Sequence, residues 1–324
     1  MFSYRALLQQ AWKITWDYKT LWLFGVFASI AAASGSFEYQ ILVNNFQNGV
    51  LESSYYHLGM FLLILKTIGG FILGLINLFS YNILDIINTL TILIITGTII
   101  ASFVWLSITS QGALVLNAKK LIATKKKSEN IDIKESFAQG NKYFWQILGF
   151  NVLAKFAIAV ILFLISLPLV FLASKASDLL SSLYTLAFII FIPLAIAASL
   201  ILKYAIAYLV LEDENFCSAF KKSWRLFIKN WLVSVEMGII LFLISFLVGI
   251  VLLALMSVFI FPYFIFALDY GVGWLMITLA LITFFLLLIS SAILSTFQIS
   301  AWTGLFLDLK NNRGLAKLER LFKK

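Results

Sequence analysis

The sequence predicts an all-α, polytopic integral membrane protein, in which six transmembrane helices form three hairpins and a cytoplasmic amphipathic surface helix precedes each hairpin. Its composition is the first reason: 62% of the 324 residues are hydrophobic and 12% are charged, whereas a soluble domain averages roughly 45–50% and 25%. The second reason is that long apolar segments alternate with short polar ones. The third is that Lys and Arg gather at the ends of the apolar segments. We therefore expect one membrane domain over residues 1–324.

The N-terminal segment, residues 1–18, is expected to form a surface helix with Trp12 and Trp16 at the membrane interface. The apolar stretch at about 21–36 follows it as the first span. This stretch also has the character of the apolar part of a signal peptide. The 20 residues before it are long for the charged region of such a peptide, so we favour a retained membrane anchor.

Six apolar segments match the length of a transmembrane helix, because about 20 helical residues cross the hydrocarbon of a bilayer. The predicted spans are about 21–36, 86–116, 147–172, 183–211, 232–261 and 272–305. The first is short, yet its Gly25, Ser29 and Ala33 recur every four residues and form a small-residue face. Such a face allows another helix to approach closely, so we expect this span to pack tightly against a neighbour.

A further apolar segment, residues 58–79, is interrupted by Lys66 and several glycines. The polar residues 37–58 before it contain no Lys or Arg, which indicates an outer loop. Residues 119–142 contain seven lysines, which indicates a cytoplasmic loop. The chain must cross the bilayer an odd number of times between these loops, and residues 86–116 supply one crossing. We therefore predict that residues 58–79 are interfacial or re-entrant.

The distribution of basic residues sets the predicted orientation. Of the 24 Lys and Arg residues, 20 lie in the first 20 residues, the loop 119–142, the segment 212–231 or the basic tail 306–324. Lys175 alone lies in a clear outer turn. By the positive-inside rule the four basic segments are cytoplasmic. The sequence thus predicts a multi-pass protein of the cytoplasmic (plasma) membrane with both termini cytoplasmic.

The segment 212–231, which we call the elbow, lies between two predicted spans. Its aromatic side chains recur at helical spacing on one face, and its basic side chains lie on the opposite face. This pattern is typical of a helix at a membrane surface, with rings in the headgroup region and cations toward anionic lipid. The alternatives are that the basic face binds a protein partner or only fixes the topology. The predicted contacts with anionic headgroups on the cytoplasmic face are Lys221, Lys222, Arg225, Lys229, Trp224 and Trp231.

Three stretches share this aromatic and basic character, and each precedes an apolar span. They read AWKITWDYKTLWLFG, SFAQGNKYFWQIL and YLVLEDENFCSAFKKSWRLFIKNW. The stretches resemble a broad group of prokaryotic multi-span proteins, which includes the membrane domain of some glycerophosphoryl diester phosphodiesterases and related families of unknown function. The three stretches indicate an internal repeat of a surface helix plus a hairpin, used three times; alternatively, any connection from the cytoplasm into the membrane favours Trp and Lys. The resemblance implies only the multi-span architecture. The tail after the last span has about 17 residues, far below domain size, so the resemblance carries over no catalytic domain and no catalytic residue.

Residue types of common active sites are scarce, because the chain has one histidine, His57, and one cysteine, Cys217. A histidine-rich zinc or haem site is thereby excluded, and a conventional catalytic triad is disfavoured. No metal, cofactor or enzymatic activity is predicted. Ionisable residues inside predicted spans are the remaining candidates, because such residues are rare in bilayers. They would line a polar region open to the cytoplasm; alternatively, the lysines extend to the headgroups and the glutamate forms a structural pair. The candidate intramembrane polar site is Asn151, Lys155, Lys203 and Glu236.

Three classes of function are compatible with these features. The first is a non-enzymatic membrane module in envelope organisation or in a membrane complex, with lipids and a membrane protein as partners. The second is a small lipid or solute transporter, for which Pro168 and Pro193 would provide hinges in two spans. The third is an intramembrane enzyme. A nucleic-acid partner is not expected, because the basic residues lie at the ends of apolar segments.

Overall fold

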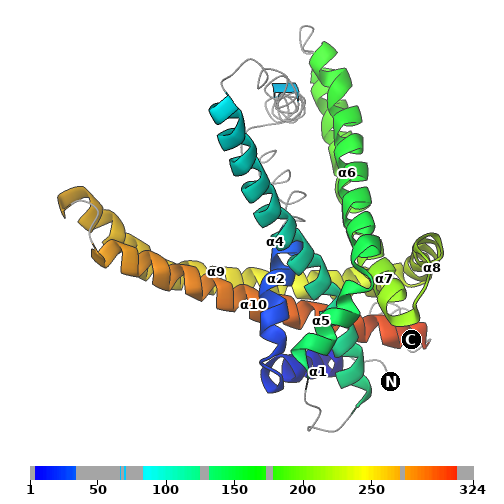
Figure 1. The fold of residues 1–324 in the computed structure, drawn as a ribbon. Helices are drawn as coiled ribbons and strands as arrows, with labels where there is room; N and C mark the ends of the chain where they lie inside the picture. Colours follow the sequence, from blue (N-terminus) through cyan, green and yellow to red (C-terminus); the bar gives the residue numbers. More distant parts are fainter. Residues whose placement is uncertain are drawn as a thin grey trace. The chain divides into compact units, whose positions relative to one another are not determined.

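The computed structural model describes residues 4–33, 66, 69–70, 83–124, 131–172, 178–270 and 274–311. Within these residues every element is an α-helix, as predicted (Figure 1). The elements are α1 (Tyr4–Asp17), α2 (Leu21–Ala33), α4 (Ile83–Ala123), α5 (Ile133–Asn141), α6 (Phe144–Leu172), α7 (Asp178–Glu212), α8 (Phe216–Lys229), α9 (Trp231–Tyr270) and α10 (Trp274–Lys310).

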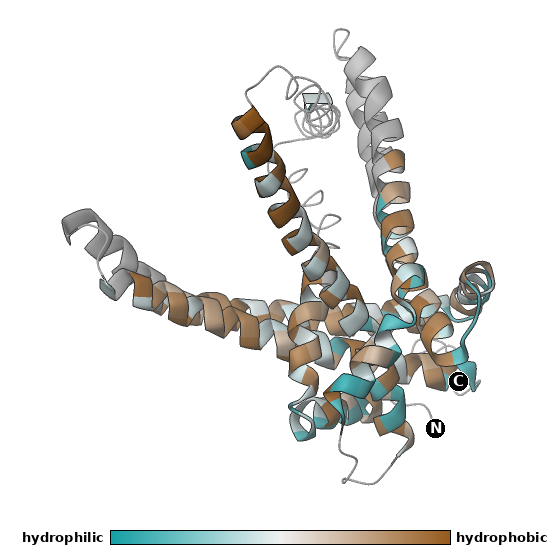
Figure 2. Ribbon diagram, in the orientation of Figure 1, coloured by the Kyte–Doolittle hydropathy of each residue, from teal (hydrophilic) through white to brown (hydrophobic). Residues whose placement is uncertain are grey.

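Three stretches in the described part of the chain are long and apolar enough to cross a membrane: Ile86–Ala123, Trp231–Val258 and Ile277–Lys310. They belong to α4, α9 and α10, whose hydrophobic character is visible in Figure 2. These helices identify a membrane protein. The other three predicted spans coincide with helices as well, namely α2 with 13 residues, α6 with 29 and α7 with 35. That these three cross a membrane stays a prediction.

Several predicted boundaries need correction because helices continue past them. The predicted loop 119–142 is partly helical: α4 continues to Ala123, and α5 lies wholly within the predicted loop. The predicted tail at 306–324 begins too early, since α10 continues to Lys310. Phe306 and Leu309 are buried there, so packing extends the helix. The rest of the tail lies outside the described residues, as does the predicted interfacial segment 58–79 apart from three positions.

The chain divides into two compact units. The first contains residues Met1–Ala32, Leu106–Ile147 and Leu200–Lys324, and the second contains Ala33–Trp105 and Leu148–Ser199. Large side chains from α2, α4, α7, α9 and α10 form the core of the first unit. The most completely buried of these are Leu21, Phe24, Leu114, Tyr204, Leu209, Met237, Leu305, Phe306 and Leu309. For the parts of these helices that lie in a bilayer, close van der Waals packing and interhelical hydrogen bonds stabilise the core, because lipid tails are as apolar as the buried side chains.

Outside this core the helices expose large apolar side chains. In the first unit Leu247 of α9 and Phe285 of α10 are 61% and 57% exposed. In the second unit Ile92 of α4 and Phe156 of α6 are each 66% exposed. Exposed apolar surface on this scale is uncommon in a soluble monomer. It fits helices whose surroundings are lipid.

Close contact between α2 and α10 confirms the predicted small-residue face. A Cβ atom added to Gly25 would lie 2.4 Å from the carbonyl oxygen of Ala292 and 2.4 Å from Oγ1 of Thr296. One turn later Ser29 Oγ lies 3.4 Å from Ser291 Oγ. Only a glycine allows the two backbones to approach this closely.

Helix α5 packs against α4 in a similar way. A Cβ atom on Gly140 would lie 2.4 Å from the carbonyl oxygen of Thr109 and 2.9 Å from the amide nitrogen of Ala113. Nearby, Ser136 Oγ of α5 donates a hydrogen bond of 3.3 Å to Asn117 Oδ1 of α4. The start of α5 is fixed by Asp132, whose carboxylate accepts a hydrogen bond from the Lys134 amide as an N-cap. The segment therefore folds back onto α4.

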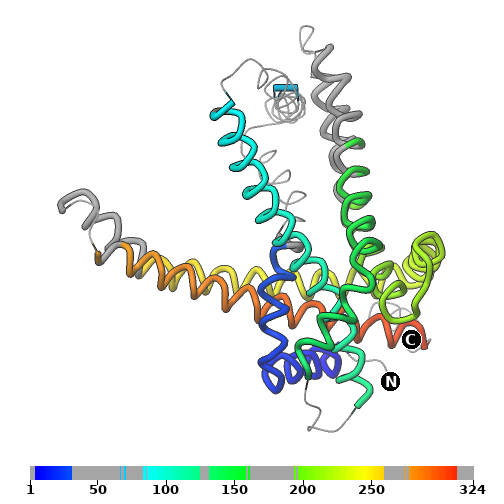
Figure 3. Tube along the Cα trace, viewed as in Figure 1, coloured from blue at the N-terminus to red at the C-terminus, as the bar shows by residue number. Residues whose placement is uncertain are grey.

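A short helix followed directly by an apolar helix occurs three times in the described chain. The pairs are α1 with α2, α5 with α6, and α8 with α9. The connections are short, consisting of residues 18–20, 142–143 and 230. Figure 3 traces these pairs along the chain. This order of elements agrees with the predicted repeat of surface helix and span, while the pairing of spans as three hairpins stays a prediction.

Candidate functional site

Three consecutive acidic residues occupy the end of α7 and the turn that leads into α8, and each binds a lysine from a different part of the first unit. Glu212 Oε1 lies 2.5 Å from the Nζ atom of Lys310 in α10. Asp213 forms an ion pair with a lysine of the α5–α6 turn, and Glu214 forms one with a lysine of α8. The carbonyl oxygen of Leu211, just before the turn, accepts a hydrogen bond of 2.8 Å from Lys119 Nζ of α4. We call Glu212, Asp213 and Glu214 the acidic turn.

Asp213 has the most contacts within the acidic turn. Its two carboxylate oxygens are each 3.0 Å from Lys142 Nζ, and Oδ1 also accepts a 3.0 Å hydrogen bond from the Tyr143 hydroxyl. The Lys142 ammonium also lies 5.1 Å from the centroid of the Tyr143 ring. The backbone of Asp213 has a φ of 55°, a left-handed conformation that aspartate adopts more readily than most residues. These contacts join the α5–α6 turn to the α7–α8 turn.

The same contacts shift the pKa values of the groups involved. Hydrogen bonds from Lys142 and Tyr143 lower the pKa of the Asp213 carboxyl. The hydrogen bond to Asp213 raises the pKa of the Lys142 ammonium. Burial raises the pKa of the Tyr143 hydroxyl, and its hydrogen bond to Asp213 adds to that shift. The side chains of Lys142 and Asp213 are 60% and 65% exposed, so solvent screens the pair, and its role is mainly to position the turns.

Glu214 connects the acidic turn to α8 itself. Its carboxylate accepts a hydrogen bond of 2.6 Å from Ser218 Oγ and a second one from Lys222 Nζ. The hydrogen bond from Lys222 is the main cause of the lowered pKa of Glu214. Asn215, the N-cap of α8, has the extended backbone of a cap, but its side chain makes no capping hydrogen bond. Glu214 with Ser218 and Lys222 thus fixes the first turns of α8.

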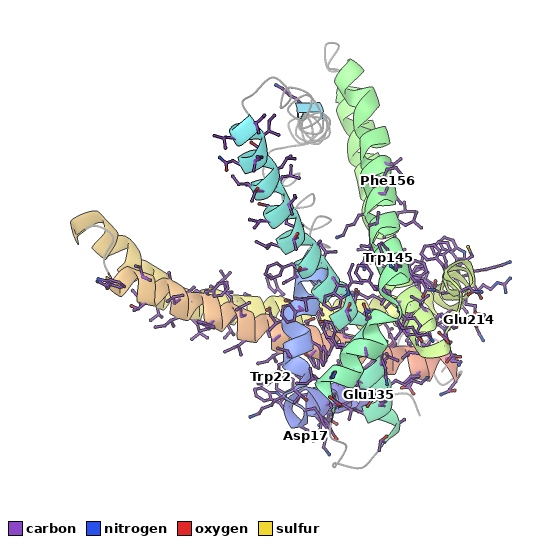
Figure 4. The ribbon with its side chains drawn as sticks, in the orientation of Figure 1. Asp17, Trp22, Glu135, Trp145, Phe156 and Glu214 are labelled. Atoms are coloured by element: carbon purple, nitrogen blue, oxygen red, sulfur yellow. The ribbon has the colours of Figure 1, made fainter. Side chains whose placement is uncertain are left out.

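Helix α8 has three distinct sides. Ala219, Ser223 and Leu226 are buried and form the side that faces the protein. Large apolar residues form an exposed side, on which Phe220, Trp224 and Ile228 are 45%, 49% and 55% exposed. Trp231, the first residue of α9, is 56% exposed. The basic residues form the third side. Of the predicted aromatic stripe, Phe216 and Phe227 are only partly exposed. Figure 4, which labels Glu214 at the start of α8, shows the side chains of this helix.

The four predicted basic contacts of α8 are all exposed but are not equivalent. Lys222 binds Glu214, so its ammonium has a protein partner. Lys221 and Arg225 make no hydrogen bond or ion pair with any other residue that the structure describes. Helical spacing places both beside the exposed apolar side, since Lys221 is three residues before Trp224, and Arg225 is three before Ile228. Lys229 lies closer to Lys222, on the flank toward Leu226.

The candidate intramembrane residues lie in both units. Asn151 is partly buried and Lys155 is exposed, both on the part of α6 that belongs to the second unit. Lys203 and Glu236 belong to the first unit. The predicted polar region around Lys155 and Glu236 therefore stays a prediction.

In the first unit, partners that the sequence did not indicate surround these two residues. The hydroxyl of Tyr4 donates a hydrogen bond of 2.5 Å to Glu236 Oε2. The ammonium of Lys203 lies 4.6 Å from the centroid of the Trp302 ring, which is a cation–π contact. Tyr4 begins the amphipathic helix α1, and Trp302 lies near the end of the apolar helix α10. Both positions suggest interface anchors in a sequence, so their pairing with specific charges was not foreseeable.

Further polar contacts join helices whose segments are far apart in the chain. The hydroxyls of Tyr204 in α7 and Ser234 in α9 are 2.7 Å apart and share a hydrogen bond. Gln298 Nε2 of α10 donates a hydrogen bond of 2.6 Å to Ser245 Oγ of α9. Interhelical hydrogen bonds of this kind stabilise helix association in membranes. The apolar segments contain several polar residues each, so the sequence did not indicate which of them would pair.

No group of three or more His, Cys, Asp or Glu side chains that could hold a metal ion occurs among the described residues. Cys217 is exposed on α8 and unpaired, and His57 lies outside the described residues. The charged and polar side chains described above are thus engaged in ion pairs and hydrogen bonds between helices. Their arrangement can position helices.

No protein-family model matches the chain, and neither the curated proteins nor the solved structures include a match. The resemblance to the membrane domain of glycerophosphoryl diester phosphodiesterases therefore stays a prediction.

Proposed function

We propose that this protein is a non-enzymatic module of a prokaryotic cytoplasmic membrane. In this proposal six spans form three hairpins, both termini are cytoplasmic, and the module serves envelope organisation or holds together a membrane complex. The three long apolar helices support the membrane assignment. The short helix before each of α2, α6 and α9 supports the threefold repeat.

The acidic turn is the observation that carries the proposal. Its three carboxylates bind lysines of α10, the α5–α6 turn and α8. Carboxylates and lysines, which could otherwise act in catalysis or ligand binding, are here engaged in contacts between segments of the protein. Such contacts favour a fixed arrangement of segments, which a structural module requires.

A pair of measurements tests the proposal. Reconstituted into vesicles that contain fluorescent lipids, the protein should not accelerate lipid exchange between leaflets above the rate of protein-free vesicles. Native electrophoresis of mildly solubilised membranes should show it in an assembly larger than the purified protein. Rapid lipid exchange, or release of trapped solutes, would contradict a structural module and favour a transporter. A purified-size species in native membranes would contradict a role in a complex.

A further inference from the structure

The exposed apolar side of α8 has no described protein partner, although α8 leads directly into the apolar helix α9. We infer that α8 lies on a bilayer surface rich in anionic lipid and that Lys221 and Arg225, but not Lys222, bind the phosphate groups of the lipids. The inference rests on the proposed membrane location and names the partner of the elbow. It assigns different roles to basic residues that the sequence alone treats as equal.

The shape of α8 indicates how it would dock. Its narrow side of Ala219, Ser223 and Leu226 is buried against the protein. The exposed ridge of Phe220, Trp224 and Ile228 follows a spacing of four residues, which places the three on one face of the helix. The ridge is therefore directed away from the surface that α8 uses to pack on its own chain.

A lipid bilayer is the occupant that the surroundings of the ridge favour. Asn230 is the single residue between α8 and α9, and Trp231 begins the apolar helix. The ridge thus lies at the end of a membrane-crossing stretch, where Trp is typically found in the headgroup region. Apolar side chains flanked by cations match the interface of an anionic bilayer, into which such a face is buried.

Two of the four cations can reach that interface together with the ridge. Lys221 and Arg225 border Trp224 and Ile228. Lys222, one residue away, is held by Glu214 at the other flank of the helix. Glu214 itself is only 24% exposed at its side chain. Because this carboxylate already neutralises Lys222, we expect Lys222 to contribute little to the attraction of anionic lipid.

The single cysteine provides a probe that needs no added mutation. Cys217 is exposed and lies four residues before Lys221, on the same part of the α8 surface. The full-length protein, labelled there with a thiol-reactive fluorophore, is placed in nanodiscs of phosphatidylcholine with a minor share of phosphatidylglycerol. Bromine, a quencher, is carried either by phosphatidylglycerol or by an equal amount of phosphatidylcholine. The ratio of the two quenching values measures the local enrichment of anionic lipid.

We expect stronger quenching from brominated phosphatidylglycerol, and a ratio that falls with added salt. Lys221→Gln and Arg225→Gln should each lower the enrichment about fivefold, which corresponds to ~1 kcal/mol per basic residue at an anionic surface. Lys222→Gln is the matched control, since it removes the same charge one position away and should leave the enrichment nearly unchanged. All three side chains are exposed, so the variants are expected to fold.

Other outcomes would overturn the inference. Equal quenching by both brominated lipids would place α8 at the membrane without a preference for anionic lipid. Absence of quenching by either would place α8 away from the bilayer. Loss of enrichment in Lys222→Gln equal to that in Lys221→Gln would contradict the division of roles. None of these results bears on the number of spans or on activity, so the proposed function would be judged separately by the exchange and assembly measurements.

Discussion

At the scale of single residues, Asp213 joins two turns that lie far apart in the sequence. Its carboxylate contacts Lys142 and Tyr143, with separations of 71 and 70 residues along the chain. Pairing over that distance follows no local sequence rule, because i, i+3 and i, i+4 spacing describes neighbours on one helix only. The acidic residues suggested a favourable charge at the N-terminus of α8. The lysines that bind these acidic residues could be identified only from the structure.

We predict that acid weakens the acidic turn. The pKa of Asp213 is lowered in the folded protein by Lys142 and Tyr143, and that of Glu214 is lowered by Lys222 and Ser218. A carboxyl group whose pKa is lower in the folded than in the unfolded protein stabilises the fold at pH values above its ordinary pKa. This stabilisation is lost as the pH falls through the lowered pKa of the folded state. Asp213→Asn should therefore reduce the loss of thermal stability below about pH 4, measured on purified protein in detergent.

A matched control for that experiment is Glu135→Gln. Glu135 Oε1 lies 3.9 Å from Lys120 Nζ, and both side chains are well exposed. This longer surface pair should contribute little, so the acid dependence should be that of the unmodified protein. An unchanged acid dependence in Asp213→Asn would show that the contacts of Asp213 do not stabilise the folded state.

A second prediction concerns the hydrogen bond between Tyr4 and Glu236. Its donor and acceptor are 2.5 Å apart and partly buried, and it ties α1 to α9. Tyr4→Phe should lower the free energy of unfolding by about 1–3 kcal/mol, since it leaves a partly buried charged acceptor with one donor fewer. Tyr208→Phe is the control, because the contact of its ring with Phe306 remains. Equal losses in both variants would mean that the Tyr4 hydroxyl has no specific role.

At the scale of helices, α2 depends on close approach to α10. Besides the contacts of Gly25, the hydroxyl of Thr296 donates a 3.3 Å hydrogen bond to the carbonyl oxygen of Leu21. The small-residue spacing in the sequence predicted that α2 would have a close neighbour. It could not predict which helix, since Leu21 and Thr296 are 275 residues apart in the chain.

Gly25→Ala tests this packing. The added methyl group would lie 2.4 Å from a backbone oxygen of α10, so a helix must shift. We expect destabilisation of about 1–3 kcal/mol, as for other overpacked sites, measured by unfolding in mixed micelles. Gly249→Ala in α9 is the control, because a Cβ atom there meets nothing within 4 Å. Similar stability of the two variants would contradict a tight α2–α10 contact.

Amphipathic helices were the elements best defined by the sequence. The bounds of α1 agree with the predicted surface helix to within three residues at its start, and α8 occupies most of the elbow. In both, apolar and basic side chains alternate with a helical period, and the signal ends where the period ends. The ends of apolar helices were less predictable. In α4 and α10 the helix continues beyond the apolar run because the following residues are also packed.

At the scale of the whole molecule, the long helices exceed what a bilayer requires. The 41 residues of α4, 40 of α9 and 37 of α10 extend roughly 55–60 Å at 1.5 Å per residue. The hydrocarbon of a bilayer is about 30 Å thick. Each helix therefore either tilts strongly or continues outside the hydrocarbon. In α10 the exposed apolar residues lie before Ala292 and the buried ones after it, so the first part is the one suited to lipid.

The orientation of the spans yields the last prediction. In a Cys217→Ser background, a cysteine at Gln47 should react with a membrane-impermeant maleimide added to intact cells, because residues 37–58 lack basic residues. A cysteine at Lys126, within a lysine-rich segment, should react only after the membrane is permeabilised, and that reaction is its positive control. Labelling of Lys126 in intact cells together with Gln47 would mean that residues 58–79 cross the bilayer. The number of spans would then be seven, and the termini would lie on opposite sides of the membrane.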